Sequence, residues 1–142
     1  MKNEPGLRDC ACRNLRMTTR VITQYYDTAL RPTGLSAAQF ALLAAVSAAG
    51  GRTIGALAEA QLMDQTTATR SIELLKKNGY LEARTGEVDS RKRHIWITEQ
   101  GNETLNKAIP YWEQAQETIE QGIGREKYED FLATLAELRS MI

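Results

Sequence analysis

Residues 53–78 read TIGALAEAQLMDQTTATRSIELLKKN, and this stretch predicts two helices joined by a tight turn. Thr53 is placed to cap the first, short helix, because a threonine hydroxyl accepts a hydrogen bond from the first helical turn. The turn 61–63 follows, and Asp64 is a strong cap for the second helix. Apolar residues then recur at helical spacing until Gly79, which supplies the usual stop.

The second of these helices has an apolar face and a polar face. The inner face is formed by Ala68, Ile72 and Leu75, and the outer face carries Gln65, Thr66, Thr69, Arg70 and Glu73. The outer residue types are those that read DNA in the major groove: glutamine binds adenine, arginine binds guanine or phosphate, and threonine contacts a thymine methyl group or a phosphate. A solvated polar face is the alternative explanation of the same pattern.

The flanking sequence completes a recognisable arrangement. Ser36 and Gln39 form a capping box for a helix that precedes the two described above and stops at Gly50-Gly51. Downstream, residues 80–85 and 93–98 fit strands, the second by its alternation of apolar side chains. Three short helices followed by a hairpin describe a mainly α fold, a winged helix-turn-helix with a two-stranded β wing.

The tip of the predicted hairpin, residues 86–92, is polar and ends in basic residues. Asp89 lies two residues before Arg91, so we expect a carboxylate–guanidinium pair to hold the loop. Arg91, Lys92 or Arg93 would then approach a narrow minor groove of DNA. The alternative is a solvated run of charge.

Long amphipathic helices are predicted at both ends of the chain. Residues 9–30 keep one apolar face, residues 125–142 form the last helix, and Pro110 is expected to kink the helix between 99 and 124. These apolar stripes are too wide for a small winged core to cover, so we expect a second copy to bury them. Packing of both helices onto their own domain is the alternative.

We therefore expect a single domain over residues 1–142. Its winged DNA-binding core covers about 35–98, and its dimerisation helices cover about 9–34 and 99–142.

Composition excludes several classes of protein. The chain has 142 residues, 42% of them apolar and 25% charged, which suits a globular domain. No apolar run reaches the roughly 18 residues of a membrane span. The first residues lack the apolar segment of a signal peptide, so the expected compartment is the cytoplasm. One histidine and two cysteines argue against a Ser-His-Asp triad, a disulfide framework and most metal sites.

The formal net charge is zero, but the charge is unevenly distributed. Residues 1–63 hold seven Lys and Arg against four Asp and Glu, a net +3, and residues 64–98 hold seven against five, a net +2. Residues 99–142 hold four against nine, a net −5. A locally positive surface that attracts a phosphate backbone is therefore compatible with this neutral chain.

Over nearly its whole length the sequence resembles MarR-type transcriptional regulators. The resemblance is carried by 53–58 (TIGALA), 64–70 (DQTTATR), 75–81 (LKKNGYL), 89–91 (DSR) and 97–101 (ITEQG). The Asp-x-Arg wing followed by a hydrophobe-Thr-x-x-Gly junction is the most specific part. Most members have two successive arginines after the wing aspartate, whereas this chain has Ser90 and then Arg91.

The resemblance implies a homodimer that places two winged domains on one palindromic DNA operator. It also implies that a small ligand or an oxidant changes the affinity for DNA. The DNA contacts of the family fall on Gln65, Thr66, Thr69 and Arg70 in the recognition helix and on Arg91 in the wing.

Two groups of residues are candidates for sensing that signal. Cys10 and Cys12 lie near Arg8, Arg13 and Arg16, and neighbouring cations favour a reactive thiolate; an inert pair of thiols near a frayed end is the alternative. The aromatic residues Tyr25, Tyr26, Phe40 and Trp112, with Arg16 or Arg20, are candidates for a cleft between the dimerisation helices and the winged core. Family members commonly bind phenolic or aromatic carboxylate compounds there, and an ordinary hydrophobic core is the alternative.

The sequence thus predicts a DNA-binding regulator rather than an enzyme, with no cofactor and no metal. Repression of transcription, released by a small aromatic ligand or by oxidation, is the expected mode. A thiol-based redox enzyme using Cys10 and Cys12 and a winged-helix module that binds protein are the competing classes.

Overall fold

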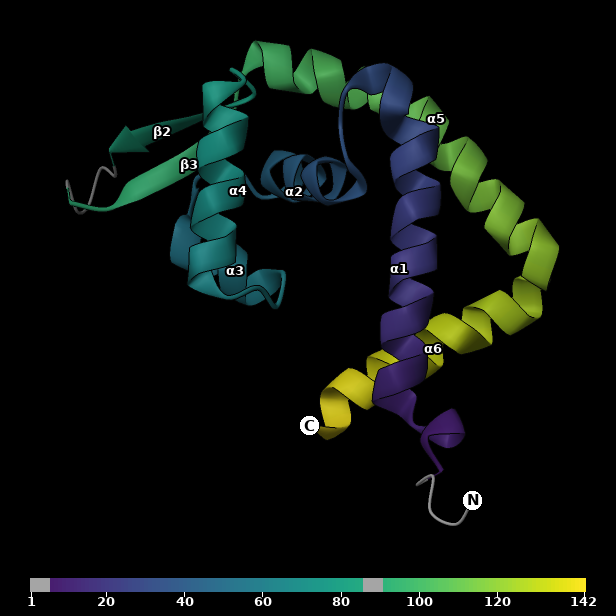
Figure 1. Cartoon of the computed structure of the whole chain (residues 1–142). Coiled ribbons are helices and arrows are strands. Elements are labelled where there is room, and N and C mark those ends of the chain that lie inside the picture. Colours follow the sequence, from purple (N-terminus) through teal and green to yellow (C-terminus); the bar gives the residue numbers. More distant parts are fainter. Residues whose placement is uncertain (1–5, 86–90) are drawn as a thin grey trace.

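The computed structural model describes residues 6–85 and 91–142 (Figure 1). Its elements follow in the order η1 (Leu7–Asp9), α1 (Ala11–Leu30), η2 (Arg31–Thr33), α2 (Ala37–Ala48), β1 (Arg52–Thr53), α3 (Ile54–Ala60), α4 (Gln65–Lys77), β2 (Leu81–Thr85), β3 (Arg93–Ile97), α5 (Glu99–Ile123) and α6 (Arg125–Met141). The prediction of a mainly helical winged helix-turn-helix with long terminal helices is confirmed.

The predicted caps of α2 and α3 form as the sequence indicates. The Ser36 hydroxyl accepts a hydrogen bond from the Gln39 amide at 3.1 Å, and the Gln39 side chain accepts one from the Ser36 amide at 3.0 Å. The Thr53 hydroxyl accepts from the Ala56 amide at 3.2 Å. These bonds satisfy donors that the first helical turn leaves unpaired, and so they fix where each helix begins.

The wing has one strand more than the sequence predicts. The sheet order is β1-β3-β2, all antiparallel, with Leu81 opposite Ile97 and Thr85 opposite Arg93. The added strand β1 pairs Arg52 with Ile95. It is only two residues long, too short to give an alternating pattern, and it directly follows the Gly50-Gly51 turn that the sequence marks only as a helix stop.

The core of the winged domain is aliphatic, and the long helices contribute to it. Its fully buried centre consists of Leu43, Val46, Leu57, Ile72, Leu75 and Ile95. Leu30 at the end of α1, with Leu105 and Ala108 on α5, joins the same cluster. The recognition helix α4 is therefore packed, through this core, against the C-terminal end of α1 and the first half of α5.

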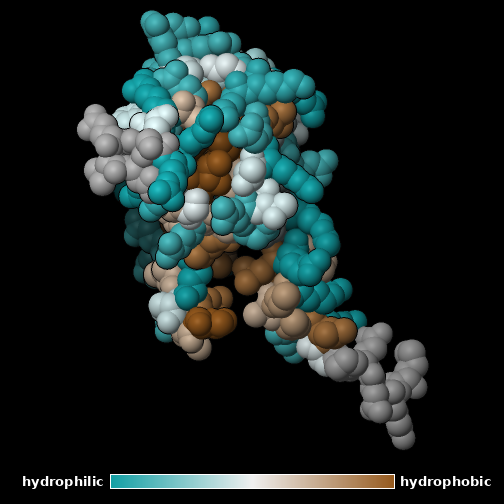
Figure 2. Space-filling model, turned by 90° about the vertical axis from the view of Figure 1, so that its left-hand side faces the viewer, coloured by the Kyte–Doolittle hydropathy of each residue, from teal (hydrophilic) through white to brown (hydrophobic). Residues whose placement is uncertain are grey.

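The remaining lengths of the terminal helices project away from this core. In Figure 1, α5 curves over the molecule, and α6 runs back from the distal end of α5 and crosses α1. Pro110 lies inside α5. Residues 11–25 of α1 are all exposed, and α6 buries no residue. Apolar side chains gather on the lower, projecting parts of the molecule in Figure 2, which the terminal helices form. No helix in the described parts of the chain is long and apolar enough to cross a membrane.

Candidate nucleic-acid interface

Helix α4 presents a polar face to solvent. Gln65, Thr66 and Arg70 are exposed, whereas Thr69 is half-buried. Glu73, on the same face, pairs with Lys76 at 3.1 Å. The predicted DNA contacts of this helix therefore lie on one exposed surface, with Thr69 at its edge.

The start of α4 is fixed by Asp64. One carboxylate oxygen accepts a hydrogen bond from the Thr67 amide at 2.8 Å, and the other accepts from the Thr67 hydroxyl at 2.7 Å. The hydrogen bond from the Thr67 side chain, followed by that from its amide, lowers the pKa of Asp64 below its ordinary value. The carboxylate is thus held ionised at the positive end of the helix dipole, where a negative charge is stabilising.

The wing carries a second set of basic residues. Arg91, Lys92 and Arg93 are exposed, and Arg93 opens β3 opposite Thr85. Asp89 lies outside the described residues, so its pairing with Arg91 stays a prediction. α4 and the wing strands lie on the same side of the molecule in Figure 1, as a protein that contacts a major and a minor groove together requires.

Two contacts at the base of the wing were not predicted from the sequence. Arg84 pairs with Glu82 and lies 5.1 Å above the ring of Trp96. His94, through Nδ1, hydrogen-bonds the Gly51 carbonyl at 2.5 Å. The pairing register explains the first contact, since Glu82 lies opposite Trp96 and Arg84 is two residues further on the same face. The second depends on β1, which the sequence pattern does not reveal.

The turn that follows α4 is tied to the start of α5. The Thr98 hydroxyl donates to the Gly79 carbonyl at 2.6 Å and accepts from the Gly101 amide at 3.0 Å, and the Thr98 amide donates to the Tyr80 carbonyl at 3.0 Å. Gly101 is buried, and a Cβ atom at this position would collide with the Tyr80 carbonyl. The junction that follows the wing is therefore a tight joint between α4, the sheet and α5.

A second site lies between α1, α2 and α5. A cavity of about 340 Å³ is lined by Tyr26, Leu30, Ala37, Phe40, Ala41 and Trp112. The rings of Phe40 and Trp112 are stacked, with centroids 5.9 Å apart and planes 24° apart. Three of the four predicted aromatic residues thus meet in one cavity. Tyr25 does not line it; its ring packs edge-on against Tyr26, and its hydroxyl donates to the Ala115 carbonyl at 3.4 Å.

Tyr26 belongs to a hydrogen-bond chain that joins the three long helices. Its hydroxyl donates to the Gln116 side-chain oxygen at 2.5 Å, and the Gln116 amide nitrogen donates to the Tyr128 hydroxyl at 2.6 Å. Burial, followed by the nearby Tyr128, raises the pKa of Tyr26 above its ordinary value. The phenol therefore keeps its proton at neutral pH and remains a donor to Gln116.

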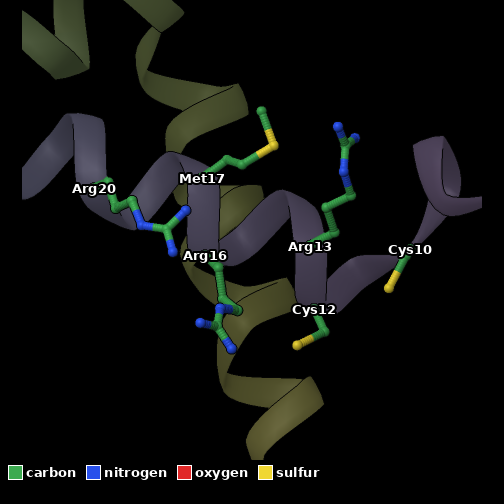
Figure 3. Close-up of a pocket in the computed structure, with 6 residues that line it drawn as sticks. All are labelled: Cys10, Cys12, Arg13, Arg16, Met17 and Arg20. Atoms are coloured by element: carbon green, nitrogen blue, oxygen red, sulfur yellow. The ribbon is translucent and has the colours of Figure 1, made fainter.

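The two cysteines lie beside a basic stripe at the start of α1. Cys10 is half-buried, Cys12 is exposed, and both thiols are free. They line one open cavity of about 400 Å³ together with Arg13, Arg16, Met17 and Arg20. Figure 3 shows these six side chains along the start of α1. Of the three arginines expected near the cysteines, Arg13 and Arg16 line this cavity with them and Arg8 does not. Arg16 and Arg20 line this cavity and not the aromatic one.

Three features together define a winged-helix DNA-binding protein. They are the helix-turn-helix with its exposed polar face, the wing with its basic end, and the long projecting helices. A model of the MarR family matches residues 33–92. MosR, a transcriptional regulator of M. tuberculosis solved in complex with DNA, is 32% identical to this chain and covers 94% of it, with 98% of its own length matched and a TM-score of 0.81. The chain belongs to the MarR family of transcriptional regulators, which are not enzymes.

One further regulator is similar to this chain in sequence, and another protein shares its fold. The transcriptional regulator HosA of Escherichia coli is 26% identical over 98 residues, which are 69% of this chain and 73% of HosA. BpsR of Bordetella bronchiseptica, whose DNA binding is regulated by 6-hydroxynicotinic acid, shares the fold: its structure covers 92% of this chain and 94% of its own length at 22% identity, with a TM-score of 0.84.

Proposed function

We propose that this DNA-binding regulator is a cytoplasmic repressor that binds a palindromic operator as a homodimer. The observation that carries the proposal is the polar face of α4, where Gln65, Thr66 and Arg70 are exposed together on a helix of 13 residues. In each half-site Gln65 and Arg70 contact base edges in the major groove, Thr66 and Thr69 contact a thymine methyl group or a phosphate, and the wing contacts the adjacent minor groove. Asp89 positions Arg91, and Lys92 and Arg93 add positive charge at the backbone.

The homodimer is supported by the surface of the terminal helices. A groove of about 300 Å³ runs between α1, α5 and α6 of one chain, and its walls are mostly apolar. It is lined by Leu15, Thr18, Thr19, Ile22, Thr23, Tyr26, Ile119, Tyr128, Phe131 and Leu135. Contiguous exposed apolar surface of this kind marks an interaction site. Pairing with a second copy through these helices buries it and sets the distance between two recognition helices.

The affinity for DNA responds to a signal, and two sites in this chain are suited to receive one. The first is the aromatic cavity at Phe40 and Trp112, whose position between α1, α2 and α5 links the terminal helices to the winged core. A small aromatic effector bound there releases the DNA. The DNA binding of BpsR, a protein of the same fold, is regulated by 6-hydroxynicotinic acid. The second is the pair Cys10 and Cys12, where a peroxide oxidises a thiolate to a sulfenic acid and is itself reduced to water or an alcohol. The sulfenic acid persists, or it condenses with a thiol of the second chain to an interchain disulfide with loss of water, and either product changes the spacing of the two recognition helices.

The experiment that tests this function is a titration of the purified chain with duplex DNA at several salt concentrations. A regulator that neutralises phosphates loses affinity steeply as salt rises, because bound counterions are released. We expect binding of this kind, with a linear fall of log affinity against log salt. Undetectable binding to any duplex at low salt, together with turnover of a model disulfide, would contradict the proposal and favour a thiol enzyme.

A further inference from the structure

The wing sheet has one face in the core and one face outside it. The inner face carries the apolar side chains that form or contact the core, which are Leu81, Ala83, Ile95 and Ile97. On the outer face Glu82 lies opposite Trp96, and Arg84 lies opposite His94. These four outer side chains are not among the proposed DNA contacts, so a different role is open to them.

Trp96 contacts two other segments of the chain, although it is still 37% exposed. The guanidinium of Arg84 lies 5.1 Å from the centre of its ring, and Glu82 pairs with the same guanidinium. The ring also lies against the turn that follows α2. A Cβ atom at Gly50 would be 3.0 Å from Cε3 of the ring, and one at Gly51 would be 2.6 Å from Cζ2. The ring can approach the backbone this closely because both positions are glycine.

The same turn is held by three consecutive residues of β3. The Gly51 amide donates to the Ile95 carbonyl at 3.0 Å, and the Gly51 carbonyl hydrogen-bonds Nδ1 of His94 at 2.5 Å. The ring of Trp96 provides the third contact. The chain continues from Gly51 through β1 to Thr53, which caps α3. The outer face of the wing is therefore joined to the segment from which the helix-turn-helix begins.

The position of Trp96 near the base of the hairpin gives this contact leverage over the wing. Figure 1 shows β2 and β3 extending away from the helices. Arg93 lies three residues further out than Trp96 on β3, which is roughly 10 Å along a strand. A tilt of about 20° at Trp96 would move Arg93 by roughly 3 Å, which is about half the width of the minor groove. A small change of angle at the base is therefore enough to misplace the wing on DNA.

We propose that Trp96 is a positioning residue of the wing. Through its contacts with Gly50, Gly51 and Arg84 it fixes the angle between the hairpin and the helix-turn-helix. The wing then enters the minor groove while α4 occupies the major groove, and Trp96 acts through the placement of Arg91 without touching DNA itself. This inference rests on the proposed function, because it explains how the wing is directed to its groove.

The test is a double-mutant cycle on operator binding, measured by fluorescence anisotropy at several salt concentrations. The probe is a labelled duplex selected from random sequences with the wild-type chain. We expect Trp96→Ala to weaken binding about tenfold and to lower the salt slope by about one, because the wing no longer neutralises its phosphate. Circular dichroism checks that the variant is folded at the temperature of the titration.

The cycle separates positioning from direct contact. Arg91→Ala should weaken binding several-fold in the wild-type chain and by less than about twofold in the Trp96→Ala chain, because the two changes remove the same contact. Arg70→Ala should have the same effect in both chains, since α4 stays in its groove. Independent effects of Trp96→Ala and Arg91→Ala would overturn the inference. It would also be overturned if Trp96→Ala masked Arg70→Ala as strongly as Arg91→Ala, because the whole domain would then be disturbed.

A second variant displaces the ring without removing it. Gly50 does not have a left-handed backbone, so the methyl group of Gly50→Ala meets Trp96 without that strain. We expect weaker binding and a lower salt slope in the wild-type chain and no effect in the Trp96→Ala chain. The matched control is Gly55→Ala on α3, where the nearest atom to the added carbon is the Thr53 hydroxyl oxygen at 4.0 Å. Equal effects of Gly50→Ala in both chains would show that the ring contact does not position the wing.

The wild-type chain and Arg91→Ala distinguish the two levels of the proposal. Absence of DNA binding by the wild-type chain would contradict the proposed function. Normal binding by Arg91→Ala would contradict the proposed contact of the wing, and the inference about Trp96 with it. A full contribution of Arg91 in the Trp96→Ala chain would contradict the inference alone.

Discussion

Arg70 is exposed near the middle of α4, and its surroundings explain why a single side chain can matter. The helix beneath it is anchored by the buried Ile72 and Leu75, and its start is fixed by the two hydrogen bonds of Asp64. On a rigid helix only the side chain of Arg70 has to be ordered when it binds a base edge, and its planar fork suits the two acceptors of guanine.

Loss of base contacts from α4 should weaken operator binding without unfolding the chain. We expect Arg70→Ala and Gln65→Ala each to cost about 1–3 kcal/mol of binding free energy. The measurement is a fluorescence-anisotropy titration of labelled operator, with circular dichroism to check the fold. Lys107→Ala removes an exposed cation of α5 and serves as the control, which should bind normally. Full affinity in both α4 variants would place the recognition surface elsewhere.

Asp64 predicts a pH dependence of stability whose sign follows from its lowered pKa. The stabilisation is complete above the unfolded-state pKa of this carboxyl and is lost as the pH falls through the lowered folded-state pKa. Thermal unfolding followed by circular dichroism from neutral to acidic pH should show a steeper loss in the wild type than in Asp64→Asn, because asparagine caps the helix without titrating. If the thermal stability of the two proteins falls equally with pH, Asp64 is not a cause of the pH dependence.

At the scale of elements, local signals predict most of the structure. The capping residues Ser36, Thr53 and Asp64 mark the starts of α2, α3 and α4 in both sequence and structure, and Thr98 caps α5 in the structure. The sequence does not predict β1, because a strand of two residues is too short to show an alternation of apolar and polar side chains. Its partner Ile95 also lies more than 40 positions away in the sequence. The contact of His94 with Gly51 depends on β1, and the contact of Arg84 with Trp96 depends on the register between β2 and β3. The sequence pattern predicts the two hairpin strands but not their register, so neither contact could be predicted.

The joint between α4 and α5 gives a prediction for an element boundary. Thr98→Val keeps the shape of the side chain but removes the hydroxyl that binds Gly79 and Gly101. Loss of a helix cap costs about 0.5–2 kcal/mol, so we expect a lower melting temperature and weaker operator binding. Thr98→Ser keeps the hydroxyl and should behave like the wild type in both measurements. Equal stability of the valine and serine variants would show that the joint is not held by this hydroxyl.

The candidate sites differ in how far the sequence defines them. Helical spacing brings Gln65, Thr66 and Arg70 to one face, and this placement is predictable from position alone. The meeting of Tyr26, Phe40 and Trp112 depends on the packing of three helices. The sequence gives no reason to prefer Tyr26 over Tyr25 as a residue that lines this cavity. The structure separates Tyr25 from Tyr26 because adjacent residues on a helix point in different directions.

At the scale of the whole molecule, the projecting helices are the feature that a single copy leaves unexplained. Phe131, Leu132 and Met141 on α6 are 42%, 45% and 73% exposed, and Val21 on α1 is 68% exposed. A chain with a net charge of zero has little repulsion to keep such surfaces apart. The proposed assembly through these helices would cover the exposed apolar side chains of α1 and α6.

A charge placed in this apolar contact should separate the two copies. Leu135 lines the groove between α1, α5 and α6, and Leu138 is half-buried one turn further on. Leu135→Glu or Leu138→Glu would bury an unpaired carboxylate at a cost of several kcal/mol, so dimer and operator binding should fail together. Analytical ultracentrifugation measures the first and anisotropy the second, with Ala133→Glu on an exposed position of α6 as the control. A monomeric variant with unchanged operator affinity would refute the dimeric mode.

The central claim is that two copies of α4, held by the terminal helices, read a palindromic operator. Selection of bound sites from a pool of random duplexes tests it most directly, followed by affinity measurements on the selected site against salt. The account predicts enrichment of an inverted repeat whose half-sites lie about one helical turn of DNA, roughly 34 Å, apart, with affinity that falls steeply with salt. Enrichment of a single unpaired motif, or of no sequence at all, would contradict it.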